Sequence, residues 1–194
     1  MTNVYTTAFE ARILEAKNKN ASSSNIKKLE KMRDACSSVA VVEALMSHDV
    51  DAERFSRAIY ASEKAISMIK QSIELDARNI NENTYAIFRT ALNCYKHDDV
   101  MTKEDARASI SRDIIVKDER KHLVFVRQII QTEQTVNAQH QTSIDALVTL
   151  NILSVSKTHK NAYTFNMNEL SERLCKNFSL DTEKASVSEL EDAE

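Results

Sequence analysis

The chain contains no glycine and no proline, and this double absence restricts its fold more than any motif does. An average protein contains about 7% glycine and about 5% proline. Without glycine, left-handed and tight turns fall to residues such as Asn and Asp, and helices lose their easiest C-terminal cap. Helices joined by polar segments satisfy this restriction, whereas a large β-architecture does not. We therefore expect a mainly α protein.

The same absence excludes several types of active site. A glycine-rich phosphate loop, a dinucleotide-binding glycine motif and a nucleophile elbow all require glycine. Cys94 and His97, followed by Asp98 and Asp99, come nearest to a metal cluster, but a structural zinc site needs four ligands and no second pair follows. The histidines are scattered, and no spacing nominates a catalytic set. We expect a non-enzymatic protein with no catalytic residues, cofactor or metal.

Tryptophan is absent as well, which raises a question about the gene. Every codon for glycine, proline or tryptophan contains GG or CC. An RNA-guided nuclease that reads a GG motif would select against these dinucleotides in a phage or mobile-element gene. A helical protein from an AT-rich genome has the same composition for a simpler reason, so both explanations stay open.

The compartment is predicted from cysteines and apolar runs. The chain has three widely separated cysteines, Cys36, Cys94 and Cys175. An odd count fits a reducing cytoplasm. The first 15 residues contain no apolar leader, and no apolar run is long enough for a membrane span. We expect a cytoplasmic protein without membrane contact, and its net charge of −3 gives no general attraction to nucleic acid.

Apolar residues at three- and four-residue steps predict a helical body over residues 1–117. We expect a first helix capped by Thr6 or Thr7, a long helix from Asn25, and a third helix capped by Asp49 or Asp51. The expected helices cover 8–17, 25 to about 47, about 52–73, 83–96 and 102–110. Thr102 and Asp105 resemble a capping box at the last of them. A short strand is expected at 114–116.

Residues 118–178 predict a small winged-helix-like module with one β-hairpin. The order is helix, turn, helix, then two alternating runs with a polar tip, which is typical of a winged helix-turn-helix. The segments are an amphipathic stretch at 121–131, a polar interval at 132–141, a second amphipathic stretch at 142–153, runs at 153–156 and 163–167, and a last helix at 168–178. Residues 179–194 are strongly acidic, and we expect a disordered tail.

Polar residues at the start of the second amphipathic stretch, and cations at the hairpin tip, are the candidate nucleic-acid contacts. They are Asn137, Gln139, His140, Gln141, Thr142 and Ser143 on the helix, and Lys157, His159 and Lys160 on the tip. Residues 135–160 carry only those two lysines against Asp145. Phosphate neutralisation supplies most non-specific affinity for DNA, so a monomer with only two lysines here should bind weakly. We therefore expect the protein to bind double-stranded DNA as a dimer, which doubles the number of cations.

One alternative competes with this interpretation, and two further candidates stand beside it without excluding it. Residues 118–153 fit a single long helix that simply packs, with the hairpin as decoration. A rival helix-turn-helix combines 83–96 with 102–110 and exposes Arg107 and Arg112. Finally, Lys27, Lys28 and Lys31 share roughly one helix face, which is either a solvated surface or a basic patch for nucleic acid or an acidic partner. The acidic tail is a potential competitor for that patch.

The leading expectation is a non-enzymatic DNA-associated regulator or accessory protein of phage or mobile-element type. It would act as a dimer through the winged module. The alternative is a helical assembly, scaffolding or inhibitor protein, such as a capsid-associated one, which binds a protein partner through its long helices. Ile66 and Ile73 are the expected exposed apolar contacts in that case.

Overall fold

A computed structural model describes residues 3–73, 81–114, 116, 120, 123, 125 and 132–184. These residues form nine helices and one small three-stranded sheet, which confirms the mainly α prediction. The helices are α1 (Val4–Asn18), α2 (Ser23–Ala35), α3 (Val39–Ser47), α4 (Ala52–Arg57), α5 (Ile59–Ile73), α6 (Glu82–Lys96), α7 (Lys103–Ala108), α8 (Glu133–Thr149) and α9 (Glu169–Asn177). The strands are β1 (Met101–Thr102), β2 (Leu153–Val155) and β3 (Ala162–Phe165).

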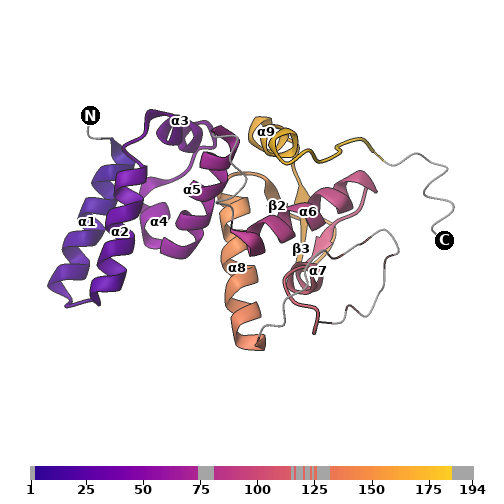
Figure 1. Cartoon of the computed structure of the whole chain (residues 1–194), viewed down its shortest axis with the longest axis horizontal. Coiled ribbons are helices and arrows are strands. Elements are labelled where there is room, and N and C mark those ends of the chain that lie inside the picture. The colour runs from indigo at the N-terminus through magenta and orange to yellow at the C-terminus, as the bar shows by residue number, and fades with distance from the viewer. Residues whose placement is uncertain are drawn as a thin grey trace.

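The molecule is elongated, with α1 to α4 at one end and the sheet at the other (Figure 1). Helices α5 and α8 pack against each other where the two ends meet. Buried apolar side chains from Tyr5 in α1 to Cys175 in α9 form one continuous core cluster. Both ends of the molecule therefore contribute to the same core.

The sheet is antiparallel, with strand order β1-β3-β2. Leu153 pairs with Phe165, and Met101 pairs with Tyr163. The hairpin predicted after residue 153 is confirmed, but β1 was not predicted as a strand. Ile114 and Val116 lie outside any strand, so the short strand expected there is wrong at these two positions. Since β1 precedes residue 118, the sheet joins the predicted body to the predicted module.

Left-handed turns confirm the expectation from the missing glycines. Six residues have φ values between 51° and 57°, and five of them are Asn or Asp. They are Asn20, Asp49, Asp98, Asn151, Asn161 and Ser179. Asn and Asp tolerate this conformation because their short polar side chains bond locally. Ser179 is the exception that the composition did not predict.

Several helix boundaries differ from the prediction. Asn3 caps α1 through its side chain, 3.0 Å from the amides of Tyr5 and Thr6, so the Thr6 or Thr7 cap is wrong. The long helix expected from Asn25 is broken between α2 and α3, and the next one is broken at Ala58. Periodicity missed both breaks because each short helix continues the same apolar spacing while the chain changes direction.

The polar interval predicted at 132–141 is instead the first half of α8. Thr132 is extended and caps the helix by accepting from the Thr135 amide, at 3.3 Å. The buried stripe of α8 begins with Val136, His140 and Ser143. Because His140 and Ser143 are polar, the sequence shows no apolar periodicity over this part of the helix. A single helix over 118–153 is therefore wrong. The helix predicted at 121–131 falls almost entirely outside the described residues.

The start of the acidic tail is folded onto the body. The amide of Leu180 donates to the carbonyl of Cys175 at 2.8 Å, and Lys184 Nζ lies 4.0 Å from the centre of the Tyr95 ring. Asp181 pairs with Lys96. The prediction of disorder is therefore wrong for residues 179–184, while residues 185–194 lie outside the described part of the chain.

Among the described residues, no helix combines the length and apolar character that a membrane crossing needs.

Candidate functional site

A cleft with a volume of about 1410 Å³ lies between α2, α5 and α8. Five lysines line it, and we call it the lysine cleft. They are Lys27, Lys28 and Lys31 from α2, and Lys64 and Lys70 from α5. Gln139 and Thr142 of α8 line it too. Two groups of residues that the sequence predicted separately, the basic patch and part of the nucleic-acid set, therefore meet in one place.

Lys64 forms the floor of the lysine cleft and is only 6% exposed. Its Nζ lies 3.0 Å from the carbonyl oxygen of Gln139 and 2.9 Å from its Oε1. It also lies 2.7 Å from Thr142 Oγ1 and 2.8 Å from Ser143 Oγ. These oxygens are all neutral. Burial lowers the pKa of Lys64 to about 8, although Glu63 and Asp145 act in the opposite direction.

The face of α8 that meets Lys64 is built by helical spacing. Gln139, Thr142 and Ser143 stand three and four residues apart, so they share the side that packs on α5. Thr84 of α6 extends the network, with its Oγ1 3.1 Å from Ser143 Oγ. Sequence reasoning missed Lys64 itself. The available signal was a lysine inside the apolar stripe of Ala61, Ala65 and Met68.

The α2 lysines of the cleft have different neighbours. Lys28 Nζ lies 4.2 Å from the centre of the Tyr60 ring, and Lys31 pairs with Glu63 at 3.2 Å. Neither Lys27 nor Lys70 forms an ion pair with a carboxylate among the described residues. Together with Lys28 and the buried Lys64, they make four cleft lysines without an ion pair of this kind among the described residues.

The predicted base-contacting residues divide between two environments. Asn137 is exposed and Gln141 partly exposed on the outward face of α8, where Gln141 Nε2 donates to Asp145 Oδ1 at 2.8 Å. His140 and Ser143 are 3% and 0% exposed, so the prediction that they face a ligand is wrong in this structure. His140 Nδ1 lies 3.0 Å from the Val136 carbonyl oxygen. Burial lowers the pKa of His140, which favours a neutral ring.

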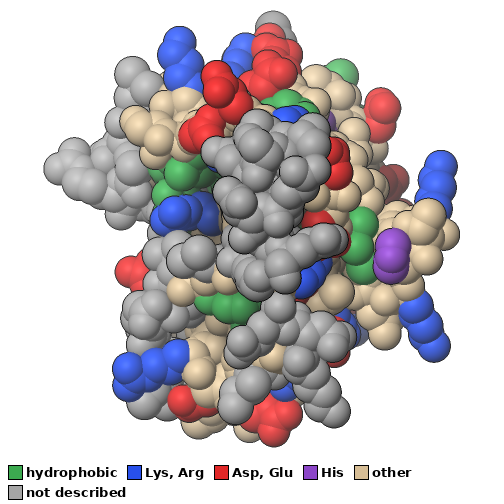
Figure 2. All heavy atoms as spheres, turned by 90° about the vertical axis from the view of Figure 1, so that its right-hand side faces the viewer, with side chains coloured by type: hydrophobic (Ala, Val, Ile, Leu, Met, Phe, Trp, Pro, Cys, Tyr) green, Lys and Arg blue, Asp and Glu red, His purple; other side chains and the backbone are tan. Residues whose placement is uncertain are grey.

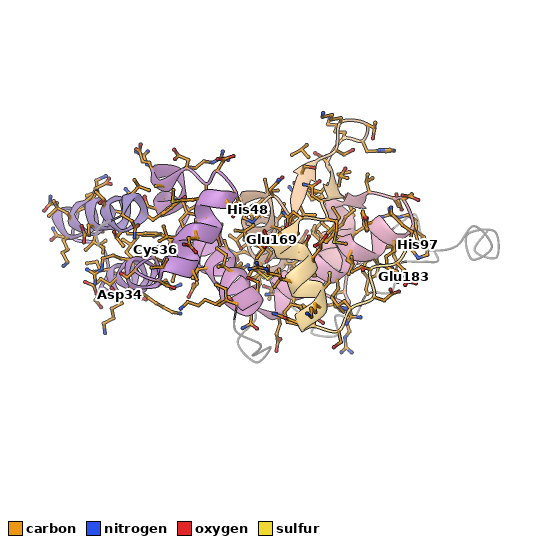
Figure 3. All side chains as sticks on the ribbon, turned by 90° about the horizontal axis from the view of Figure 1, so that it is seen from above. Asp34, Cys36, His48, His97, Glu169 and Glu183 are labelled. Atoms are coloured by element: carbon orange, nitrogen blue, oxygen red, sulfur yellow. The ribbon has the colours of Figure 1, made fainter. Side chains whose placement is uncertain are left out.

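The three residues predicted at the hairpin tip are exposed. Lys157, His159 and Lys160 lie in the β2–β3 loop (residues 156–161), which projects from the side of the molecule in Figure 3. Ser156 Oγ holds the loop by accepting from the His159 amide at 3.1 Å. The amide of Lys103 donates to the Asn161 carbonyl at 3.0 Å, so the start of α7 adjoins the loop.

The β2–β3 loop and the lysine cleft are separate surfaces. In Figure 1, α2 and the sheet lie on opposite sides of α8. Figure 2 shows the sheet end, where positive and negative side chains alternate over the coloured atoms. No single-sign field covers the described part of that face. Any anion contact there depends on a few individual cations.

The cysteine and histidine pair from the sequence does not extend into a metal site. Among the described residues, no group of three or more His, Cys, Asp or Glu side chains is arranged for a metal ion. A different cysteine, Cys36, lies at the opposite end of the molecule from His97 in Figure 3, so it is too far away to add a ligand to this pair. Burial raises the pKa of Cys36 and Cys94 to about 12, so both thiols are protonated and unreactive near neutral pH.

Comparison with known proteins gives no assignment: no family model, curated protein or solved structure matches the chain.

Proposed function

We propose that the chain is a non-enzymatic DNA-associated protein and that residues 82–177 form a winged-helix-like unit. The observation that carries the proposal is the order α6-β1-α7-α8-β2-β3 with strand order β1-β3-β2. In a winged helix, a short strand after the first helix pairs with the last strand of the hairpin, and the third helix precedes that hairpin. The unit thus begins at α6, and the rival pair at 83–96 and 102–110 supplies its first two helices.

In this unit, α8 is the recognition helix and the β2–β3 loop is the wing. Asn137 and Gln141 stand four residues apart on the outward face of α8, where the Asn137 amide can meet a base edge directly and the Gln141 amide can do so by exchanging its bond to Asp145. Lys157 and Lys160 are placed for phosphate contacts, which fix position without reading sequence. His140 and Ser143 have structural roles instead.

Charge sets the expected mode of binding. Helix α8 carries Glu133 and Asp145 and no Lys or Arg, so the positive charge comes from the wing and from the start of α7. Because affinity depends on the number of neutralised phosphates, one copy binds weakly and a dimer binds more tightly. A regulator or accessory protein fits this mode. Its phage or mobile-element origin and its cytoplasmic location remain predictions from composition.

Size-exclusion chromatography with and without duplex DNA tests this function. The wild type is expected to co-elute with a duplex of about 20 base pairs at low salt. Lys157→Ala combined with Lys160→Ala is expected to weaken binding about tenfold, because two phosphate contacts are lost. The matched control is Lys17→Ala with Lys19→Ala, two exposed lysines at the end of α1. Equal binding by the two variants would contradict the proposal.

A second candidate, assembly through protein contacts, is supported by α3. Val39 and Met46 stand seven residues apart and are 70% and 61% exposed, which marks an apolar face of the kind that partners cover. Of the contacts expected for this alternative, Ile73 is 45% exposed, but Ile66 is buried at 3%, so that expectation is wrong. If assembly is the function, Val39→Asp with Met46→Asp dissociates an oligomer that tolerates salt.

A further inference from the structure

We infer that the lysine cleft is a second binding site, separate from the wing, for a phosphate-bearing ligand of the nucleotide class. The inference does not depend on the proposed DNA contact of the β2–β3 loop. It depends on how the charges in the cleft are paired, on Lys64, and on the other groups in the lining.

The carboxylates of the cleft are already paired, whereas most of its lysines are not. Three acidic residues line it, and each has a basic partner. Glu63 pairs with Lys31 at 3.2 Å, Asp34 with Arg33 at 2.7 Å, and Glu30 with Lys17 at 3.7 Å. Arg33 and Lys17 come from outside the lining. Four cleft lysines therefore have no carboxylate partner among the described residues: Lys27, Lys28, Lys64 and Lys70.

Lys64 adds a buried positive charge that contacts no carboxylate among the described residues. Burying an ammonium group is costly unless it is paired, and here its contacts are the neutral oxygens of Gln139, Thr142 and Ser143. These contacts occupy its N–H groups, so Lys64 acts by its field and by fixing Gln139 and Thr142 in the cleft wall. An anion in the cleft would supply the missing countercharge.

The rest of the lining favours a nucleotide over a simple anion. The cleft exceeds the range of about 300 to 1,000 Å³ that is usual for small-molecule pockets, so it has room for more than one phosphate. Tyr60 lies at the edge of the cleft and is 54% exposed; Lys28 lies over one face of its ring, and a base can stack on the ring beside that lysine. Lysine is a common phosphate ligand in its role as a point charge. An acidic peptide would pair with the lysines but has no group that would stack on the Tyr60 ring.

Two sources share this chemistry, a free nucleotide and the backbone of a single strand. The probes are therefore ATP and an oligothymidylate of about eight nucleotides, with an oligoglutamate peptide of equal length as the third arm. Binding is measured by titration calorimetry with the full chain. If only ATP binds, the ligand is a free nucleotide. If oligothymidylate binds, the ligand is a single strand. Both outcomes support the inference, whereas tighter binding of the peptide than of either nucleotide probe overturns it.

The test variant is Lys27→Gln with Lys70→Gln, because neither lysine has a carboxylate partner in the described chain. The matched control is Lys19→Gln with Lys176→Gln, which makes the same charge change at two exposed lysines outside both the cleft and the wing. The cleft variant is expected to lose at least tenfold in affinity, and the control to keep it. For oligothymidylate, the salt slope becomes shallower by about 1.4, or about 0.7 per lysine. Unchanged binding by the cleft variant overturns the inference.

A wing variant, Lys157→Gln with Lys160→Gln, separates this inference from the proposed function. Loss of duplex binding in the wing variant with unchanged ATP binding supports both. If the wild type fails to bind duplex but binds a nucleotide probe through Lys27 and Lys70, the proposed function fails and the inference stands. As a further check, Tyr60→Ala is expected to weaken oligothymidylate binding about fivefold or more, since a stacking surface is removed. No change in Tyr60→Ala would contradict the nucleotide class.

Discussion

Lys64 shows how one side chain links the fold to a candidate site. Its ammonium group lies between α5 and α8, and its contacts hold Gln139 and Thr142 at the wall of the lysine cleft. The sequence could not single it out, because a lysine in an apolar stripe usually extends its amine to solvent. The left-handed positions were more predictable, since a chain without glycine leaves Asn and Asp to fill them.

The stability of the protein is expected to depend on the ionisation of Lys64. Burial lowers its pKa from 10.5 to about 8 in the folded state. Between these two values the unfolded chain binds more protons, so the free energy of unfolding rises with pH relative to a variant without the amine. Compared with Lys64→Met, the wild type should gain about 2 kcal/mol between about pH 7.5 and about pH 10.

Urea unfolding of both proteins at the two pH values measures this difference. The comparison with Lys64→Met is needed because Cys36, Cys94 and Cys175 have raised pKa values, which act in the opposite direction above about pH 9 in both proteins. A gap between wild type and variant that does not change with pH would show that the amine is not buried as described.

Ser179 gives a second prediction at this scale. Its φ of 53° is costly for serine and free for glycine. Ser179→Gly is expected to raise the free energy of unfolding by about 0.5 to 1 kcal/mol. Ser24→Gly, in the exposed helical face of α2, should lower it by a similar amount. Thermal unfolding of both variants checks the opposite signs, and a loss in both would contradict the left-handed assignment.

At the scale of elements, local chemistry was predictable where a specific cap marks a boundary. The capping box of Thr102 and Asp105 was predicted and is present, with the Thr102 amide 2.7 Å from Asp105 Oδ2. The start of α8 was missed because His140 and Ser143 interrupt its apolar stripe. Strand β1 has two residues, too few for an alternating pattern. Its pairing with β3 depends on contacts that are distant in sequence.

Asp105, the third helical residue of the α7 capping box, is expected to be the most sensitive capping residue in the described part of the chain. It is 0% exposed, and besides Thr102 it pairs with Arg120, which also pairs with Asp99. Asp105→Ala removes the side-chain half of the capping box and leaves a partly buried guanidinium with fewer partners. We expect a loss of about 3 kcal/mol or more in the free energy of unfolding.

The control for Asp105→Ala is Glu104→Ala, an exposed acidic residue in the same helical turn. It should cost about 0.5 kcal/mol or less, since only a weak interaction with the helix dipole is removed. Chemical denaturation distinguishes the two variants. Similar small losses would mean that the Asp105 network does not stabilise the fold.

At the scale of the whole molecule, net charge is a poor guide to binding. The chain carries −3 overall, yet lysines that pair with no described carboxylate gather between α2, α5 and α8, and others lie on the β2–β3 loop. Sequence spacing placed Lys27, Lys28 and Lys31 on one helix face but could not bring them to Gln139 and Thr142. Their shared position around the cleft depends on the packing of α2 and α8 against α5. The mainly α fold followed from composition, whereas the site required the tertiary structure.

The central claim, contact between the wing and DNA phosphates, is tested most directly by the salt dependence of duplex binding. Fluorescence anisotropy gives the affinity of wild type and of Lys157→Ala with Lys160→Ala between about 50 and about 200 mM salt. We predict that affinity falls steeply with salt and that the double variant makes the slope shallower by about 2 for each bound copy. Salt-independent wild-type binding, or identical slopes in both proteins, would contradict the account.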